Sequence, residues 1–446
     1  MDKVYTDIAI IGGGASGLAC AAAAAKNYYD NGRKVSIVII EKEARVGKKL
    51  LATGNGRCNF TNINSSEKNY FGTFKKYIPE LFSEQCPDKV IGFFESIGLV
   101  CKTETDGRVY PYSKQSSSVL DVLRLVLGRL NVKEICNEKV ESIVLGNNNF
   151  IVNTKTTAIT AKKIVMAVGG KSSPDLGSDG SCFSTLQKMG HRIIPMRPSL
   201  TPIYVESPLI KSLKGVRAEG TVSLFCGDEL EAVIKRGETQ TENLSFHRNF
   251  ARKPDGALCA GNIKSETGEI QFTENAVSGI CAFNLSRHLY LQGNCKLSIN
   301  LLPGFTFEKT YKMVLDRVDL FKNDLTENLF TGLFQKRVGL ALLKACGIPL
   351  NVFSEHLKDS QIKELSKLLI DWQFKIKNSK CFKSSQVTAG GVLGDEINCR
   401  TMESKIINNM YIIGEMIDID GECGGHNLQF AFATGILAGR SLGTVR

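Results

Sequence analysis

The hydrophobic pattern at the start of the chain combines two short apolar runs with a helical segment. Residues 7–11 (DIAII) and 35–41 (VSIVIIE) are continuous apolar runs, which predict strands buried on both faces. Between them, residues 18–26 (LACAAAAAK) predict a helix, because alanine has the highest helix propensity. Strand, helix and strand in this order are typical of a parallel sheet. The pattern therefore predicts an α/β, Rossmann-like domain.

The pattern changes twice in the remainder of the chain. Residues 193–304 consist mainly of short apolar runs separated by turns, and they predict a β-rich inserted domain. Residues 305–376 have apolar positions at helical spacing and predict a small helical module. An α/β pattern returns over residues 377–446. We therefore expect residues 1–192 and 377–446 to form one domain that two insertions interrupt.

Glycines fill the turn between the first predicted strand and its helix. Gly12, Gly14 and Gly17 fit a G-x-G-x-x-G frame. The first glycine allows a tight turn, the second lets a pyrophosphate approach the backbone, and the third lets the helix pack on the strand. Glu41 ends the second strand, where an acid commonly binds a ribose hydroxyl, and an acid suits an adenosine without a 2′-phosphate. This combination predicts dinucleotide binding, although the motif alone does not separate FAD from NAD.

A second glycine-rich segment lies at residues 53–59 (TGNGRCN). It lacks the spacing of a P-loop. Its glycines would expose backbone N–H groups to a ligand, and Arg57 and Asn59 would add polar contacts. The alternative is a surface turn rich in Gly and Asn.

Six motifs along the chain resemble one family of flavoproteins. They are IGGGASGL (11–18), KKLLATGNGRCNFTN (48–62), GRVYPYS (107–113), AVGGKSSPDLGSDG (167–180), QVTAGGV (386–392) and TMESKIINNMYIIGEMIDIDGECGGHNLQFAFATG (401–435). Over essentially its whole length the chain resembles the BaiN/YhiN-type NAD(P)/FAD-dependent oxidoreductases, which include aminoacetone-oxidase-like enzymes. The resemblance implies a glutathione-reductase-like FAD domain with an inserted β-barrel-like piece and a helical piece, and FAD in an extended pose.

The resemblance also implies which residues contact FAD. Backbone N–H groups of Asn427 and Leu428 would face N1 and O2 of the flavin at the start of the final helix, and Asp418 would face the ribityl chain or the pyrophosphate. The implied set is Gly12, Gly14, Ala15, Ser16, Gly17, Glu41, Lys42, Lys49, Thr53, Gly54, Gly56, Arg57, Cys58, Asn59, Val140, Ala167, Gly169, Gly170, Gly414, Glu415, Asp418, Gly425, His426, Asn427 and Leu428.

Three residues are candidates for the chemistry itself. His426 stands where the family commonly has Tyr, so the family's substrate preference does not transfer. It could donate a proton near the flavin, or it could fill the place of the aromatic ring. Cys58 could approach the flavin, but no adjacent cysteine offers a redox partner, which favours a structural role. Arg57 could bind an anionic substrate or a phosphate.

Two tyrosines follow a predicted hairpin turn at Asp106 and Gly107. Tyr110 and Tyr112 could line a substrate cavity, or they could pack within the hairpin. Upstream of the hairpin, residues 73–98 have apolar positions at helical spacing and predict helix.

Composition and charge narrow the class of partners. The 446 residues carry a net charge of +11, which favours anionic partners, but no basic stripe interleaved with aromatic residues indicates nucleic acid. No run approaches the roughly 20 apolar residues of a membrane helix and no signal peptide is visible, so we expect a cytoplasmic protein. No Cys/His cluster has zinc spacing, and Asp418, Asp420 and Glu422 do not complete an EF-hand, so no metal is expected.

Together these features predict an FAD-dependent oxidoreductase with a small-molecule substrate that could be anionic. With electrons from NAD(P)H it would reduce an enone-like molecule, for which the resemblance suggests a steroid or bile acid. The chain has no second G-x-G-x-x-G with its own strand and acid, so the nicotinamide would visit the flavin only transiently. The alternatives are an FAD-dependent amine or small-molecule oxidase, and an FAD protein that acts on RNA. The sequence leaves the oligomeric state open.

Overall fold

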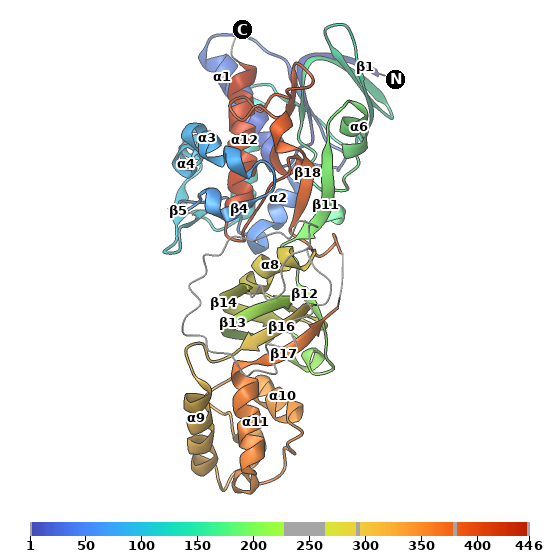
Figure 1. Cartoon of the computed structure of the whole chain (residues 1–446). Coiled ribbons are helices and arrows are strands. Elements are labelled where there is room, and N and C mark those ends of the chain that lie inside the picture. Colours follow the sequence, from blue (N-terminus) through green and yellow to red (C-terminus); the bar gives the residue numbers. More distant parts are fainter. Residues whose placement is uncertain (1, 227–263, 291–294, 378–380, 444–446) are drawn as a thin grey trace. The chain divides into compact units, whose positions relative to one another are not determined.

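The computed structural model describes residues 2–226, 264–290, 295–377 and 381–443, which belong to two compact units (Figure 1). The first, here called the α/β unit, comprises Met1–Ser199 and Cys381–Arg446. The second, here called the barrel unit, comprises Leu200–Lys380. The α/β unit is thus built from both ends of the chain.

The helices and strands of the α/β unit are as follows. In chain order they are β1 (Asp2–Ile11), α1 (Ala15–Asp30), β2 (Ile37–Ile40), α2 (Lys48–Ala52), β3 (Thr61–Asn62), β4 (Tyr70–Phe71), α3 (Ile78–Gln85), α4 (Pro87–Ser96), β5 (Cys101–Thr103), β6 (Arg108–Pro111), α5 (Ser116–Arg129), β7 (Lys133–Ile135), β8 (Val140–Leu145), β9 (Phe150–Thr154), β10 (Thr157–Met166), α6 (Phe183–Lys188), β11 (Ile193–Ser199), β18 (Val387–Val392), β19 (Met410–Ile412), β20 (Asp420–Gly421) and α12 (His426–Leu442).

A seven-stranded sheet forms the centre of the α/β unit. Its strand order is β7-β2-β1-β10-β9-β8, and β19 also pairs with β10. The strands β7, β2, β1, β10 and β19 are parallel, whereas β8 and β9 run antiparallel to their neighbours. The ends of β1 and β2 are fully buried apolar runs, as expected for parallel strands covered on both faces. The Rossmann-like α/β prediction is therefore confirmed.

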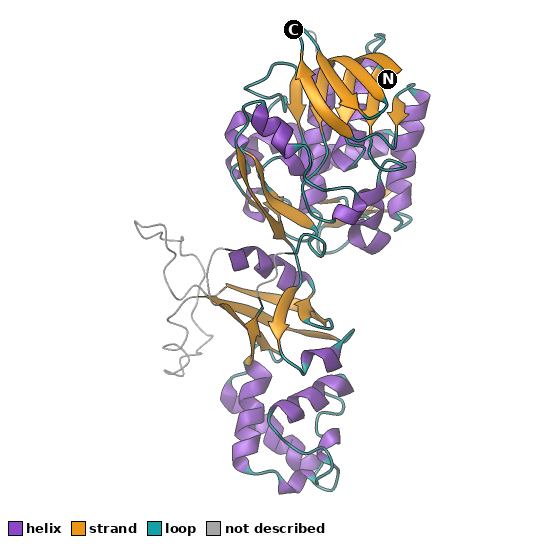
Figure 2. Cartoon of the chain, turned by 90° about the vertical axis from the view of Figure 1, so that its right-hand side faces the viewer, coloured by secondary structure: helices purple, strands orange, loops and turns teal. Residues whose placement is uncertain are grey.

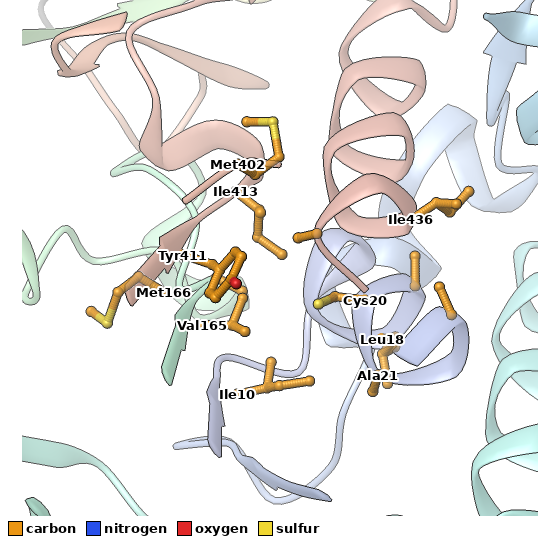
Figure 3. Packing of buried hydrophobic residues seen from close by; sticks show 14 of the residues in the cluster. Ile10, Leu18, Cys20, Ala21, Val165, Met166, Met402, Tyr411, Ile413 and Ile436 are labelled. Carbon is orange, nitrogen blue, oxygen red and sulfur yellow. The ribbon is translucent and has the colours of Figure 1, made fainter. Parts of the chain in front are cut away.

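Helices α1 and α12 pack against each other at unusually short range. A Cβ atom added to Gly435 would lie 2.4 Å from the carbonyl oxygen of Ser16, and one added to Gly439 would lie 2.5 Å from that of Cys20. Figure 3 shows the apolar layer beside these helices, with Cys20 on the helix side and Val165 on the strand side. The alanine run of α1 and the glycines of α12 thus allow two helices from opposite ends of the chain to meet.

Three smaller sheets complete the α/β unit. They are β3-β6-β5, β4 with β20, and β11 with β18, all with antiparallel pairing. The hairpin predicted at Asp106 and Gly107 is present between β5 and β6, and Gly107 has a φ of +83°. The helical segment predicted at residues 73–98 is divided into α3 and α4, because Pro87 begins a new helix after the extended Cys86.

The barrel unit contains a closed six-stranded barrel, β12-β15-β14-β13-β16-β17, together with helices (Figure 2). Its described elements are β12 (Ile203–Glu206), β13 (Arg217–Cys226), β14 (Lys264–Phe272), β15 (Ala276–Ser278), α8 (Ile280–Ser286), β16 (Cys295–Asn300), α9 (Phe307–Leu320), α10 (Lys336–Ala345), α11 (Asp359–Ile370) and β17 (Trp372–Ile376). One hydrophobic cluster includes residues of both the barrel and its helices, such as Leu297, Val314 and Leu365. The inserted β-barrel and helices are therefore both present.

The boundaries differ from those expected from the sequence. β11 pairs with β18, so the first part of the α/β unit continues to Ser199 rather than ending at residue 192. β17 pairs with β12 and β16 and completes the barrel, although the sequence pattern places residues 372–376 in the helical module. Both differences have one cause: a strand's partner lies far away in sequence, so local periodicity does not show which unit it joins. No helix among the described residues is both long and apolar enough to cross a membrane.

Candidate functional site

The candidate site lies where the parallel strands of the large sheet end. Ile11 of β1 is the register partner of both Ile40 of β2 and Met166 of β10, and Met166 in turn pairs with Ile412 of β19. Four loops therefore leave the same edge of the sheet. In open α/β sheets, ligands bind at this carboxyl edge.

Glycine is needed at the three frame positions of the first loop for different physical reasons. A Cβ on Gly12, which has a φ of +107°, would lie 2.4 Å from the carbonyl oxygen of Ala167, and one on Gly17 would lie 2.0 Å from that of Gly12. These two glycines are required by the packing of the fold. Gly14 has an ordinary φ of −82°, and a Cβ there would meet no protein atom within 4 Å. The protein itself does not require glycine at position 14, which fits a ligand close to this backbone.

Glu41 is joined to the glycine turn. One of its carboxylate oxygens accepts a hydrogen bond from the N–H of Gly13 at 2.8 Å, and the other accepts from the N–H of Glu43 at 2.9 Å. The carboxylate therefore fixes the shape of the turn in addition to any contact with a ribose. Its contact with a ribose remains a prediction.

Lys49 and Glu415 form an ion pair that joins the second and fourth loops. Lys49 Nζ lies 2.8 Å from Glu415 Oε2 and also donates to the carbonyl oxygen of Ser172 at 3.2 Å. Glu415 Oε1 accepts from the N–H of Thr388, whose hydroxyl oxygen accepts from the N–H groups of Lys171 and Ser172. Gly170 is required here, because a Cβ would lie 2.3 Å from Thr388 Oγ1. The sequence reasoning missed Thr388, although it lies within the motif at residues 386–392.

Lys42 has a partner within the α/β unit. Its Nζ lies 2.7 Å from Asp179 Oδ2. Burial alone would raise the pKa of Asp179, but hydrogen bonds from Lys42 and Ser181 outweigh it and hold the pKa well below its usual range. Asp179 already neutralises the charge of Lys42. The predicted contact of Lys42 with FAD would therefore have to form beside Asp179.

The loop at residues 53–59 has an unusual backbone. Gly54, Asn55, Gly56 and Cys58 all have φ between +55° and +83°, a region that non-glycine residues rarely adopt. Such conformations are concentrated at ligand-binding and catalytic sites. Thr53 stabilises the loop by donating its hydroxyl to the carbonyl oxygen of Leu50 at 2.7 Å, while its own carbonyl accepts from the N–H of Cys58.

Cys58, Arg57 and Asn59 differ strongly in their surroundings. Cys58 is fully buried, and this burial raises its pKa to about 12, so its thiol stays protonated at neutral pH and is a poor nucleophile. Arg57 is exposed, and its guanidinium lies over the ring of Tyr110 at 5.2 Å from the centroid. The buried Oδ1 of Asn59 has no hydrogen-bond partner among the described residues.

The start of α12 forms the other side of the candidate site. Gly425 precedes the helix with a φ of +102°, and a Cβ there would lie 2.6 Å from the carbonyl oxygen of Thr61 and 2.9 Å from Asn59 Oδ1. The Asn427 side chain accepts from the N–H of Gly421 and donates to its carbonyl oxygen, which closes the preceding loop. Within the described part of the chain, no acceptor pairs with the backbone N–H of Asn427 or Leu428.

His426 is held in place on several sides. Only 6% of it is exposed, and its Nδ1 hydrogen-bonds Ser65 Oγ at 2.6 Å. Tyr70 donates its hydroxyl to the carbonyl oxygen of His426 at 2.8 Å, and burial raises the pKa of Tyr70, which keeps this donor protonated. A Cβ at Gly421 would lie 2.9 Å from the Cβ of His426, so glycine at this position leaves room for the histidine side chain. Sequence reasoning did not find Ser65 or Tyr70, since both lie far from His426 in the chain.

Three further residues are predicted to contact FAD, namely Asp418, Val140 and Gly169. Asp418 is buried and accepts the N–H of Thr73 on its Oδ2 at 2.9 Å, so it fixes a neighbouring loop. Val140 is the partly buried first residue of β8. Gly169 has a φ of +78° and faces Ser178. Within the described ranges, no group of three or more His, Cys, Asp or Glu residues is arranged to hold a metal ion.

The residues present fit FAD in three respects. Gly14 leaves open space beside the start of α1, where the N–H groups of Ala15 and Ser16 suit a pyrophosphate. The unpaired N–H groups at the start of α12 suit a flavin carbonyl. Buried polar atoms are nearly always hydrogen-bonded, so the lone Oδ1 of Asn59 indicates that a donor is missing. This parallel sheet with its glycine turn defines a Rossmann-type dinucleotide-binding protein.

Comparisons with known proteins place the chain within this class. The family model described as the HI0933-like protein Rossmann domain matches residues 6–441, and the chain belongs to this family. It is 32% identical over 438 residues to the 3-dehydro-bile acid delta(4,6)-reductase of Clostridium scindens, covering 97% of this chain and 98% of the relative. It is 25% identical over 428 residues to the ribosomal RNA dihydrouridine synthase of Escherichia coli, covering 96% of each. The corresponding enzyme of Haemophilus influenzae is 23% identical over 441 residues, again covering 96% of each chain. The protein is an FAD-dependent oxidoreductase, as the sequence predicted.

Proposed function

We propose that the protein is an FAD-dependent reductase that uses NAD(P)H to saturate a carbon–carbon double bond conjugated to a carbonyl group in a small organic molecule. A ring enone of steroid or bile-acid type is the preferred substrate class. The observation that carries this proposal is the 32% identity to the bile acid reductase over almost the full length of both chains.

The chemistry implied by the relatives' names supports the reaction class. A 3-dehydro-bile acid with 4,6 double bonds has those bonds conjugated to a ketone, and dihydrouridine is uridine whose ring double bond, conjugated to a carbonyl, has been reduced. Both activities therefore add hydrogen across an activated double bond. A reduced flavin, when bound, supplies the hydride for such a reaction, and the protein supplies orientation and a proton.

The chain's own residues would hold the cofactor at two helix starts. The turn around Gly14 and the first N–H groups of α1 would bind the pyrophosphate. The N–H groups of Asn427 and Leu428, at the positive end of α12, would stabilise negative charge on the flavin carbonyl. Asn59 Oδ1, beside Gly425, would accept a hydrogen bond from the same ring.

His426 is the proposed proton donor to the substrate. A hydride added to a conjugated double bond leaves negative charge that a proton must neutralise. If Ser65 donates its hydroxyl to Nδ1 of His426, the ring proton resides on Nε2, which lies against Gly424. The hydrogen bond of Ser65 thus holds the ring and that of Tyr70 holds the backbone of His426, so that one defined nitrogen can transfer the proton.

A stopped-flow measurement tests the proposal. The purified flavoprotein is mixed anaerobically with NADH or with NADPH, and the visible flavin absorbance is followed. We expect rapid bleaching with one of them, then recovery of the band when a 3-oxo-Δ4 steroid acid is added. Bleaching without recovery across a panel of enones would contradict the substrate class, and no bleaching with either nucleotide would contradict the donor.

A second candidate function is reduction of uridine in RNA. It is favoured by the 25% identity to the E. coli ribosomal RNA enzyme over 96% of both chains. The test is mass spectrometry of ribosomal RNA from cells with and without the gene. Loss of one dihydrouridine in the deletion strain, restored by the wild-type chain and not by His426→Phe, would establish this function instead.

A further inference from the structure

The small sheet β3-β6-β5 presents an exposed face beside the candidate site. Lys102 of β5 is the register partner of Tyr110 of β6, and the N–H of Tyr112 donates to the carbonyl oxygen of Val100. Since alternate residues of paired strands point to the same face, these four side chains share one face of the hairpin. Val100, Lys102 and Tyr112 are exposed, whereas Tyr110 is buried. Arg57 lies over the ring of Tyr110 and belongs to the same surface.

This face is continuous with the start of α12. Asn62 of β3 donates its side-chain amide to the carbonyl oxygen of Gly424 at 3.0 Å. The loop that carries Arg57 also contains Asn59, whose Oδ1 lies close to Gly425. A molecule whose reactive end reached the start of α12 could therefore extend across the small sheet.

The cations of this region fall into two groups. Arg108 lies 3.2 Å from Asp106, and Lys114 lies 2.9 Å from Glu104. Arg57 and Lys102 have no carboxylate within ion-pair distance among the residues that the structure describes. The two acids are thus already paired, and two cations on the exposed face are available to an external anion.

The apolar part of the face is also exposed. Val100 is 65% exposed and Tyr112 is 69% exposed, although both are large apolar side chains. Neighbouring positions on one face are separated by roughly 7 Å along a strand and roughly 5 Å between strands. An area of this size matches a few fused rings, and its combination of apolar and cationic groups matches an amphipathic anion.

Resting on the proposed function, we infer that Arg57 and Lys102 form the subsite for the anionic group of the substrate, whose apolar skeleton lies on Val100 and Tyr112. The substrate class is therefore a fused-ring organic anion with a carboxylate or similar group remote from its enone. Arg57 is well suited to this role because its strained loop and its stacking on Tyr110 pre-organise the guanidinium. Lys114 also lowers the pKa of Glu104, with smaller contributions from Arg57 and Arg108, which shows that the surroundings are positive.

Binding of a non-reactive probe separates this inference from the reaction itself. The holoprotein is titrated calorimetrically with a saturated bile-acid carboxylate and with its neutral primary amide, neither of which contains an enone. We expect the wild-type protein to bind the carboxylate about three- to tenfold more tightly at low salt, the scale of an exposed charge-assisted contact. This preference should shrink in 0.5 M NaCl, because salt screens exposed charges.

Variants identify the cations responsible. Arg57→Met should abolish the carboxylate preference, Lys102→Met should reduce it, and Arg57→Lys should restore part of it. Lys114→Met is the matched control, because it removes a cation that follows β6 closely in the chain and already has a partner. An equal preference in wild type and Arg57→Met, or an equal loss in Lys114→Met, would overturn the subsite.

The outcomes also distinguish failure of the subsite from failure of the proposed function. If a neutral enone amide is reduced equally by wild type and Arg57→Met, and the carboxylate probe shows no preference, the reductase stands and the subsite is wrong. If no enone is reduced and neither probe binds, both are wrong. If a single-stranded RNA binds in an Arg57-dependent manner while both probes bind equally, the face is a nucleic-acid surface and the inference is overturned.

Discussion

Two helices begin at the candidate site, and their first turns have different surroundings. Before α1, Gly14 leaves empty space, and the helix start presents backbone N–H groups without a side-chain cap. Before α12, Gly425 is packed against the β3 segment, and His426, held by Ser65 and Tyr70, begins the helix. The first arrangement suits a group of fixed charge such as a phosphate, whereas the second contains groups that can transfer a proton. We therefore expect the start of α1 to bind the cofactor's phosphates and the start of α12 to take part in the proton transfer.

The largest expected effect is the loss of FAD binding when the start of α1 is altered. Gly14→Val should abolish FAD binding while the chain still folds, because the new side chain enters open space next to the expected pyrophosphate. Gly17→Val is the matched control, since its Cβ would lie 2.0 Å from a backbone oxygen and should cost roughly 1–3 kcal/mol or more of stability. Visible absorbance and chemical denaturation measure the two properties. A fully yellow Gly14→Val protein would contradict the assignment.

The next effect tests the α12 side. His426→Phe should slow reduction of the enone at least about 100-fold, the scale of a lost general acid, while FAD affinity changes little. The exposed His356 of the barrel unit provides a control, because His356→Phe should leave the rate unaltered. Single-turnover rates over a range of pH provide the measurement. A normal rate in His426→Phe would show that His426 only fills the place of the family's aromatic residue and donates no proton.

A smaller effect is expected at Glu41, because this residue would both bind the cofactor and stabilise the fold. Glu41→Ala should weaken FAD binding about tenfold or more, because a charged hydrogen-bond partner of the ribose would be lost. It should also destabilise the apoprotein, since the N–H groups of Gly13 and Glu43 lose their acceptor. Fluorescence titration with FAD and denaturation of the apoprotein separate the two effects. Unchanged FAD affinity in a destabilised protein would show that Glu41 serves only the turn.

The two helix starts also differ in how far the sequence could predict them. The strand, turn and helix around Gly14 are consecutive in the chain, so the glycine spacing and the alanine run were sufficient. The surroundings of His426 come from segments more than 350 residues away, because its partners Ser65 and Tyr70 lie near the N-terminus. A position in the sequence can indicate that a histidine begins a helix, but it cannot show which hydroxyl its ring meets.

Fold-level predictions have the same dependence on sequence distance. The α/β unit and the inserted barrel were predicted from local periodicity, whereas the last barrel strand, β17, was assigned to the helical module because it follows α11 directly. The network of Lys49, Glu415 and Thr388 was only partly predicted for a related reason. Lys49 lies in α2, Thr388 in β18 and Glu415 shortly after β19, so only the folded chain brings these three segments together.

The smallest expected effect concerns Ser65, which we regard as a positioning residue for His426. Ser65→Ala removes the 2.6 Å hydrogen bond to Nδ1 and should lower the rate of enone reduction about three- to tenfold, whereas Ser65→Thr should keep most of it. A merely structural role could give a similar rate loss, so ¹⁵N NMR of the labelled histidine ring is the deciding measurement. In the wild-type protein the proton should reside on Nε2, and Ser65→Ala should give a mixture of tautomers. If the ring has the same tautomer in both proteins, Ser65 does not orient the proton, and the distinction between the two helix starts rests on His426 alone.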